Sequence, residues 1–193
     1  MLKHLFILLY KLIAETTATW TMLAEEKTGK SSENFHKSYL FPIIGLIALL
    51  SFAGTLLLSS KSLDLQLALK IVIKQALVYF GSFYLISFIL SEYVFPRFGL
   101  AKDLGLSEQF AGYSSSLIYV VAMAQSLFPG FFWFLGIVVF YTIYIIWVGA
   151  AQFLKIEENQ WTKFTIFASI IIMMVPHIVR LLVELMPGMK IRL

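Results

Sequence analysis

The sequence predicts an all-α, polytopic membrane helix bundle with about five transmembrane helices and an N-terminal interfacial amphipathic helix. Of its 193 residues, 60% are hydrophobic and 13% are charged, and the mean hydropathy is +0.85. A soluble domain has about 25% charged residues, so this chain has too little polar surface to cover itself in water. Its apolar residues also gather in long stretches of roughly the 20 residues that a membrane-spanning helix needs.

The N-terminal segment "MLKHLFILLYKLIAE" is apolar but too short to span a membrane. Lys3, His4 and Lys11 interrupt it. We interpret it as an amphipathic helix lying at the membrane interface; a cleaved signal peptide and a packed or re-entrant segment are the alternatives. Residues 25–38 then predict a polar linker, because Gly, Ser and mixed charges are typical of loops. Residues 1–38 therefore form a region of their own.

Residues 39–193 contain five apolar stretches, which we interpret as a five-helix transmembrane domain. None of them alternates in polarity over about ten residues, as the strands of a membrane barrel do. The predicted spans are residues 39–59, 71–95, 111–128, 131–154 and 164–186. Pro129 and Gly130 predict a tight turn between the third and fourth spans. The longest predicted loop covers residues 96–110, which leaves no room for a separate soluble domain.

The distribution of basic residues predicts the orientation of the chain. With five spans, the N-terminal region and loops 96–110 and 155–163 share one side. That side carries nine of the 15 Lys and Arg residues: Lys3, Lys11, Lys27, Lys30, Lys37, Arg97, Lys102, Lys155 and Lys163. The other side carries Lys61, Lys70, Lys74, Lys190 and Arg192. Because basic residues favour cytoplasmic loops, we expect a cytoplasmic N-terminus and a C-terminus on the opposite side.

Several short motifs resemble those of one membrane-protein family. The N-terminal segment contains Trp20, the first span begins with "YLFP" at 39–42, the third opens with Gly112, Tyr113 and Ser114, and the fourth ends "WVGAAQFLKIEE". Together with the five-span layout, this arrangement resembles the Yip1-like family, in particular its prokaryotic branch. The "DLYGP" signature of the eukaryotic members is replaced here by "YLFP".

The resemblance implies a non-enzymatic integral membrane protein that acts by binding or by membrane organisation, in the plasma membrane of a prokaryote. Eukaryotic members act in vesicle trafficking and contact Rab-type GTPases. This chain lacks their "DLYGP" signature, which argues against that role here. The expected partner is the lipid bilayer, and a membrane or cytoplasmic protein partner and a homo-oligomer stay open. A small transporter or channel that uses a polar face of the fifth span is the alternative function.

The sequence offers no signature of catalysis. It contains no P-loop, no G-x-G-x-x-G, no G-x-S-x-G and no H-E-x-x-H motif. It also contains no cysteine, which excludes thiolate chemistry and Cys-ligated metals. We therefore expect no catalytic residues, cofactor or metal, and the formal charge of +4 is attributed to loop charges rather than to nucleic-acid binding.

The strongest candidate site is a polar face on the fifth predicted span. His177, Arg180 and Glu184 fall within an arc of roughly 60° at 100° per residue. Ionisable groups near the centre of a bilayer cost about 2.5–3.5 kcal/mol each on insertion scales, so they require a reason. One reason is a structural ion pair or snorkelling of Arg180. The other is a polar ligand site or proton site, to which Pro176 would add a freed backbone carbonyl.

Two lysines at the entry of the second span form the second candidate. Lys70 and Lys74 lie one helical turn apart, where like charges repel slightly. They are interpreted either as interfacial residues that snorkel to headgroups, or as partners of an acidic lipid or of Glu184. With the C-terminus on the far side, Lys70, Lys74 and Glu184 all lie toward that side. A joint polar site with His177 and Arg180 follows if the second and fifth spans are neighbours.

The third span carries small hydroxyl residues from Ser114 to Ser116, preceded by Tyr113 and followed by Gln125. Small polar residues let membrane helices approach closely and form hydrogen bonds across the contact. Helix packing and the lining of a pore or ligand site are both consistent with this pattern.

Cysteine labelling tests the predicted topology, since the chain has no native cysteine. Ser32→Cys should react with a membrane-impermeant reagent from the cytoplasmic side and Lys190→Cys from the opposite side. Labelling of both positions from one side would contradict a five-span topology.

Overall fold

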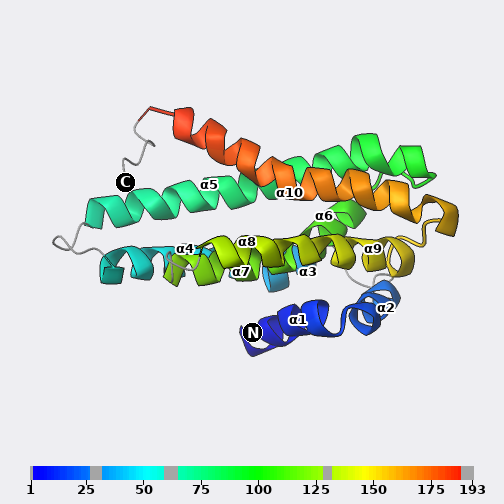
Figure 1. Cartoon of the computed structure of the whole chain (residues 1–193), viewed down its shortest axis with the longest axis horizontal. Helices are drawn as coiled ribbons and strands as arrows, with labels where there is room; N and C mark the ends of the chain where they lie inside the picture. The colour runs from blue at the N-terminus through cyan, green and yellow to red at the C-terminus, as the bar shows by residue number, and fades with distance from the viewer. Residues whose placement is uncertain (1, 27–31, 59–64, 128–131, 188–193) are drawn as a thin grey trace.

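The computed structural model describes residues 2–26, 32–58, 65–127 and 132–187. Within these ranges the chain is helical and contains no strand. Figure 1 shows that the long helices run roughly along one common axis, with the helices of the N-terminal region on one flank. The predicted all-α bundle is therefore confirmed. The predicted turn at Pro129 and Gly130 lies outside the described residues.

Within the described residues, four helical segments are long and apolar enough to cross a membrane: His36–Leu57, Leu65–Phe98, Leu135–Gln152 and Glu158–Leu185. Their α-helices are α4 (Phe41–Leu58), α5 (Leu65–Ile89), α8 (Phe132–Val138), α9 (Thr142–Gln152) and α10 (Trp161–Leu185). Shorter helices are α1 (Leu2–Ala14), α2 (Thr16–Glu26), α3 (Ser32–Phe35), α6 (Leu104–Ser114) and α7 (Ser116–Leu127). These ranges support a membrane protein built from a helical bundle.

The helical segment that contains α4 begins earlier than the sequence predicts. Helix α3 and a π-helical turn, His36–Leu40, lead directly into it, so residues 32–38 of the predicted linker are helical. The reason is burial: the side chains of Phe35, Tyr39 and Leu40 are packed in the core, and that gain outweighs the loop-like composition of the segment.

The predicted loop at 96–110 is also shorter than expected. Helix α6 begins at Leu104, where the Asp103 side chain accepts a hydrogen bond from the Leu106 backbone N–H at 2.9 Å. This is an N-cap, which satisfies a backbone donor at the start of the helix. Phe110, inside the predicted loop, is fully buried.

The third predicted span is a broken helix. Helices α6 and α7 meet at Ser115, whose backbone angles of φ −81° and ψ 2° depart from the helix. The Ser115 hydroxyl donates to the Ala111 carbonyl at 2.8 Å. The Tyr39 hydroxyl lies 2.6 Å from the Ser116 hydroxyl. The Ser115 and Ser116 hydroxyls thus have partners inside the bundle, which membrane hydrocarbon cannot supply, whereas the buried Ser114 hydroxyl has none within the described part of the chain.

The N-terminal helix is amphipathic, as predicted, and its buried face packs on the bundle. Leu5, Leu9 and Leu12 are buried, and α1 contacts both α7 and α4. Helix α2 is fixed by Trp20, which is fully buried and donates its indole N–H to the Ile145 carbonyl at 3.1 Å. The N-terminal region therefore joins the hydrophobic core of the helical bundle.

Helices α4 and α7 approach each other closely at Gly54. A Cβ atom at this position would lie 1.9 Å from the backbone oxygen of Ser126. One turn earlier, the hydroxyls of Ser51 and Ser126 are 2.9 Å apart. Small residues with hydroxyl hydrogen bonds are the usual means by which membrane helices pack closely.

Gly54→Ala should therefore destabilise the bundle by about 1–3 kcal/mol, because the methyl group forces α4 and α7 apart. Thermal unfolding in detergent would measure this. Gly45→Ala is the matched control on the same helix, since a Cβ at Gly45 meets no atom within 4 Å. Equal melting temperatures for the two variants would show that the close approach does not contribute to stability.

Candidate functional site

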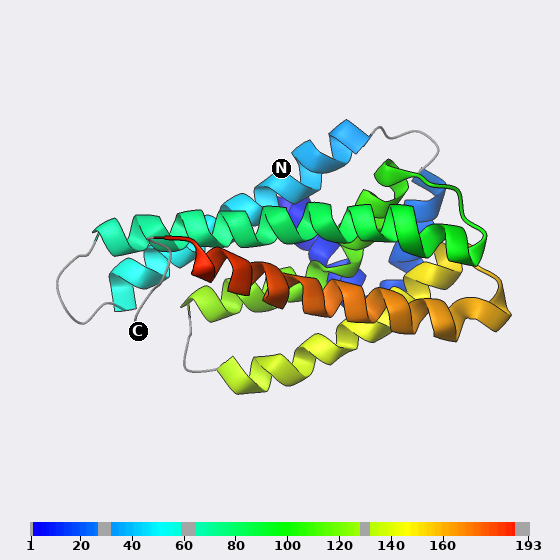
Figure 2. The same ribbon diagram turned by 90° about the horizontal axis from the view of Figure 1, so that it is seen from above.

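Helices α5 and α10 lie side by side, as Figure 1 and Figure 2 both show. This contact brings Lys74 and Glu184 together, with the ammonium nitrogen 2.6 Å from a carboxylate oxygen. The Lys74 side chain is 16% exposed and that of Glu184 is 40% exposed. The structure therefore agrees with the interpretation in which Lys74 pairs with Glu184, rather than with the one in which it extends to lipid headgroups.

Arg180 lies one helical turn before Glu184 and makes a different contact. Its guanidinium interacts with the Tyr79 hydroxyl of α5 through charge and hydrogen bonding, and it lies within electrostatic reach of the Glu184 carboxylate. Arg180 is half-buried and Tyr79 is buried. Arg180 thus has a phenol as its neighbour on α5 and a carboxylate within electrostatic reach, while that carboxylate forms its ion pair with Lys74.

The other predicted residues are placed less centrally. His177 is exposed, and its Nδ1 lies 2.9 Å from the Met173 carbonyl. The carbonyl one turn earlier in the same helix holds the ring near the helix surface. Lys70 lies one turn before Lys74, is half-buried and takes no part in the Lys74–Glu184 ion pair.

A cavity of about 290 Å³ opens beside Arg180. Its walls come from α5, α7, α8, α10 and the short turn that joins α8 to α9. Most of the lining is apolar, and the polar lining side chains are Tyr79, Gln125, His177 and Arg180. We call this the span-five cavity. It combines a largely apolar wall with a few convergent polar groups, which is the usual composition of a small-molecule site.

The polar groups lie at different depths along α10. Met173 is the middle residue of this helix, so at about 1.5 Å per residue Arg180 is about 10 Å and Glu184 about 16 Å beyond its centre. The hydrocarbon core extends about 15 Å from the bilayer midplane. If α10 is centred in the membrane, Arg180 lies within the hydrocarbon and the Lys74–Glu184 pair lies at its boundary.

The family motif lies outside the span-five cavity and acts in packing. A Cβ at Gly112 would lie 2.4 Å from the Phe35 ring, so the missing side chain lets Phe35 pack directly on α6. Tyr113 packs edge-on against Phe35 with ring centroids 5.2 Å apart. Ser114 is fully buried.

Sequence reasoning missed Tyr79, because a tyrosine in an apolar helix gives no sign of its partner. It named Gln125 only as part of a packing or lining pattern. Among the described residues, no group of three His, Asp or Glu side chains is arranged to hold a metal ion.

Comparison of the chain with protein-family models, curated proteins and solved structures gives no match. The span-five cavity must therefore be interpreted from its own geometry, and the Yip1-like resemblance stays a prediction.

The Lys74–Glu184 pair can be tested by a double-mutant cycle. Lys74→Leu should lower the melting temperature in detergent, because it leaves the Glu184 carboxylate without its ion-pair partner. Lys74→Leu combined with Glu184→Leu should recover part of the loss. Additive losses in the double variant would mean that the two side chains are not coupled.

Arg180→Leu should also lower the melting temperature, since it removes the partner of the buried Tyr79 hydroxyl. Arg97→Leu, at an exposed position of the turn Phe95–Phe98, is the matched control and should be nearly neutral. A neutral or stabilising Arg180→Leu would show that the arginine merely snorkels.

Proposed function

We propose that this protein is a non-catalytic integral membrane protein that binds the anionic headgroup of a lipid in the span-five cavity and thereby organises the surrounding membrane. The observation that carries the proposal is Arg180, a half-buried cation that lines this cavity and has a phenol as its partner. A Yip1-like role in membrane organisation is consistent with this activity.

The charges around the cavity favour an anionic ligand. Lys74, Arg180 and Glu184 together have two positive charges and one negative charge, and the negative charge is paired with Lys74. A cation that lies within hydrocarbon is costly unless it is paired. A phosphate group would remove that cost, because the planar guanidinium of Arg180 binds phosphate oxygens in a bidentate manner.

The shape of the site favours an amphiphile over a free ion. Apolar side chains from α5, α7 and α10 form most of the lining, among them Val78, Ile118 and Val121. Large apolar side chains on the outward face of α10, such as Ile178, Leu181 and Leu182, are exposed, as expected for a helix that faces lipid. A lipid would place its chains along these surfaces and its headgroup near Arg180.

Lipid binding in detergent tests the proposal. Native mass spectrometry should show that phosphatidylglycerol binds more tightly than phosphatidylcholine. Arg180→Gln should weaken phosphatidylglycerol binding about tenfold, since a charge-assisted hydrogen bond is lost. Arg97→Gln is the control and should keep the preference. An unchanged preference in Arg180→Gln would refute the assignment.

A transporter or channel is the second candidate, favoured by the convergence of Arg180, His177 and Gln125 on one cavity. It predicts solute flux into liposomes that depends on these residues. Flux that is lost in Arg180→Gln and kept in Arg97→Gln would favour this alternative over a lipid-binding role.

A further inference from the structure

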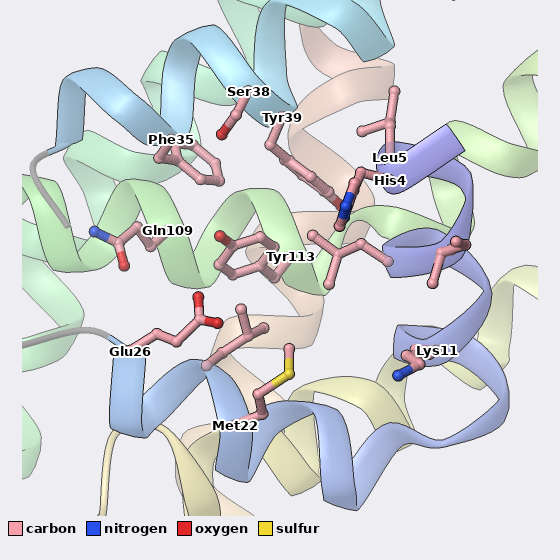
Figure 3. Close-up of a pocket in the computed structure, with 13 residues that line it drawn as sticks. His4, Leu5, Lys11, Met22, Glu26, Phe35, Ser38, Tyr39, Gln109 and Tyr113 are labelled. Atoms are coloured by element: carbon pink, nitrogen blue, oxygen red, sulfur yellow. The ribbon is translucent and has the colours of Figure 1, made fainter. Parts of the chain in front are cut away.

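A second cavity lies between the N-terminal helices and the bundle, on a different set of elements from the span-five cavity. Its volume is about 440 Å³, within the range of about 300–1,000 Å³ that is typical of ligand sites. Helices α1 and α2 form one side of it, and α3, the π-helical turn and α6 form the other. We call it the N-terminal cavity (Figure 3).

One wall of the N-terminal cavity is a rigid aromatic cluster. Ring centroids are 5.4 Å apart for Phe35 and Tyr39, 5.2 Å for Phe35 and Tyr113, and 4.8 Å for Tyr39 and Tyr113. The Tyr39 hydroxyl is fixed by Ser116 at 2.6 Å. Because these rings are packed against one another in the core, the wall is formed before any ligand binds.

Opposite charges line opposite ends of this cavity. Figure 3 shows Glu26 on the side of Phe35 and Tyr113, and Lys11 and His4 on the other side, on α1. The Glu26 carboxylate lies within electrostatic reach of the Tyr113 hydroxyl. Lys11 is half-buried at the other end. Aliphatic side chains of α1 and α2 lie between the two ends.

We propose that the N-terminal cavity binds a zwitterionic amphiphile that has an ammonium group and a phosphate group. The ammonium group lies at Glu26, over the faces of Phe35 and Tyr113, where a carboxylate and aromatic rings together recognise a cation. The phosphate group lies at Lys11 and His4. The aliphatic lining takes an acyl chain. This site is independent of the proposed lipid site at Arg180, and it selects a different headgroup charge.

Isothermal titration of the full chain in a maltoside detergent tests the proposal. Three probes separate the chemistries: lysophosphatidylethanolamine, which is zwitterionic; lysophosphatidylglycerol, which is anionic; and phosphoethanolamine, which has no acyl chain. The Arg180→Gln variant, in which the other proposed site is weakened, should bind the zwitterionic lysolipid at least about tenfold more tightly than the anionic one. Binding of phosphoethanolamine alone at the same affinity assigns the cavity to a free zwitterion, and a requirement for the chain assigns it to a lipid.

Glu26→Gln and Lys11→Gln, made separately in the Arg180→Gln background, should each weaken binding of the zwitterionic probe about tenfold, because each removes one charge-assisted contact. Glu25→Gln is the matched control, since Glu25 is adjacent in the chain but does not line the cavity, and it should bind as the parent does. Lys11→Gln, on the opposite wall, keeps the test valid if Glu26→Gln fails to fold. Equal affinity for the two lysolipids, or unchanged affinity in the folded variants, would overturn the proposal.

Discussion

The irregular backbone at Ser115 divides one helical stretch into α6 and α7, and each of these helices lines a different cavity. The two halves of the stretch Leu104–Leu127 contact different neighbours: α6 packs on α5 and α9, and α7 packs on α4 and α1. Helix α6 places Tyr113 at the N-terminal cavity, and α7 places Gln125 at the span-five cavity. Two hydroxyls at the break have partners inside the bundle: that of Ser115 donates to the Ala111 carbonyl, and that of Ser116 bonds to the Tyr39 hydroxyl.

Close packing around the break depends on small residues. Gly112 lets Phe35 lie against the backbone of α6, and Gly149 accommodates the Trp20 ring, from which a Cβ would be 2.8 Å away. Both contacts join the N-terminal region to helices of the bundle, α6 and α9. The helices of the N-terminal region are therefore part of the core, and the N-terminal cavity exists because α1 and α2 are fixed in this position.

The ionisable groups of α5 and α10 also need partners inside the bundle, because hydrocarbon supplies none. Lys74 and Glu184 satisfy each other, whereas Arg180 has the Tyr79 hydroxyl as its partner and faces a cavity. A neutral phenol does not cancel the arginine charge. Arg180, rather than the Lys74–Glu184 ion pair, is therefore the group available to bind an anionic ligand.

The site could be predicted from the sequence in part. Helical periodicity put His177, Arg180 and Glu184 on one face, and the positions of Lys74 and Glu184 at corresponding ends of their helices made an ion pair conceivable. Periodicity does not specify which helices are neighbours, so the contact of α5 with α10 and the role of Tyr79 could not be derived. The side-chain orientation of His177 could not be derived either, because its bond to the Met173 carbonyl is a rotamer choice within one helix.

The sequence by itself determined that the chain forms apolar helices of membrane-spanning length, because burying backbone polar groups in an apolar chain of this composition requires helices. It also determined the amphipathic face of α1 through the spacing of Leu5, Leu9 and Leu12. Only the tertiary structure decided that residues 32–38 and 104–110 are helical, since core contacts of Phe35 and Phe110 outweigh local composition. It alone decided the break at Ser115 and the two cavities, because these depend on which side chains from distant parts of the chain meet.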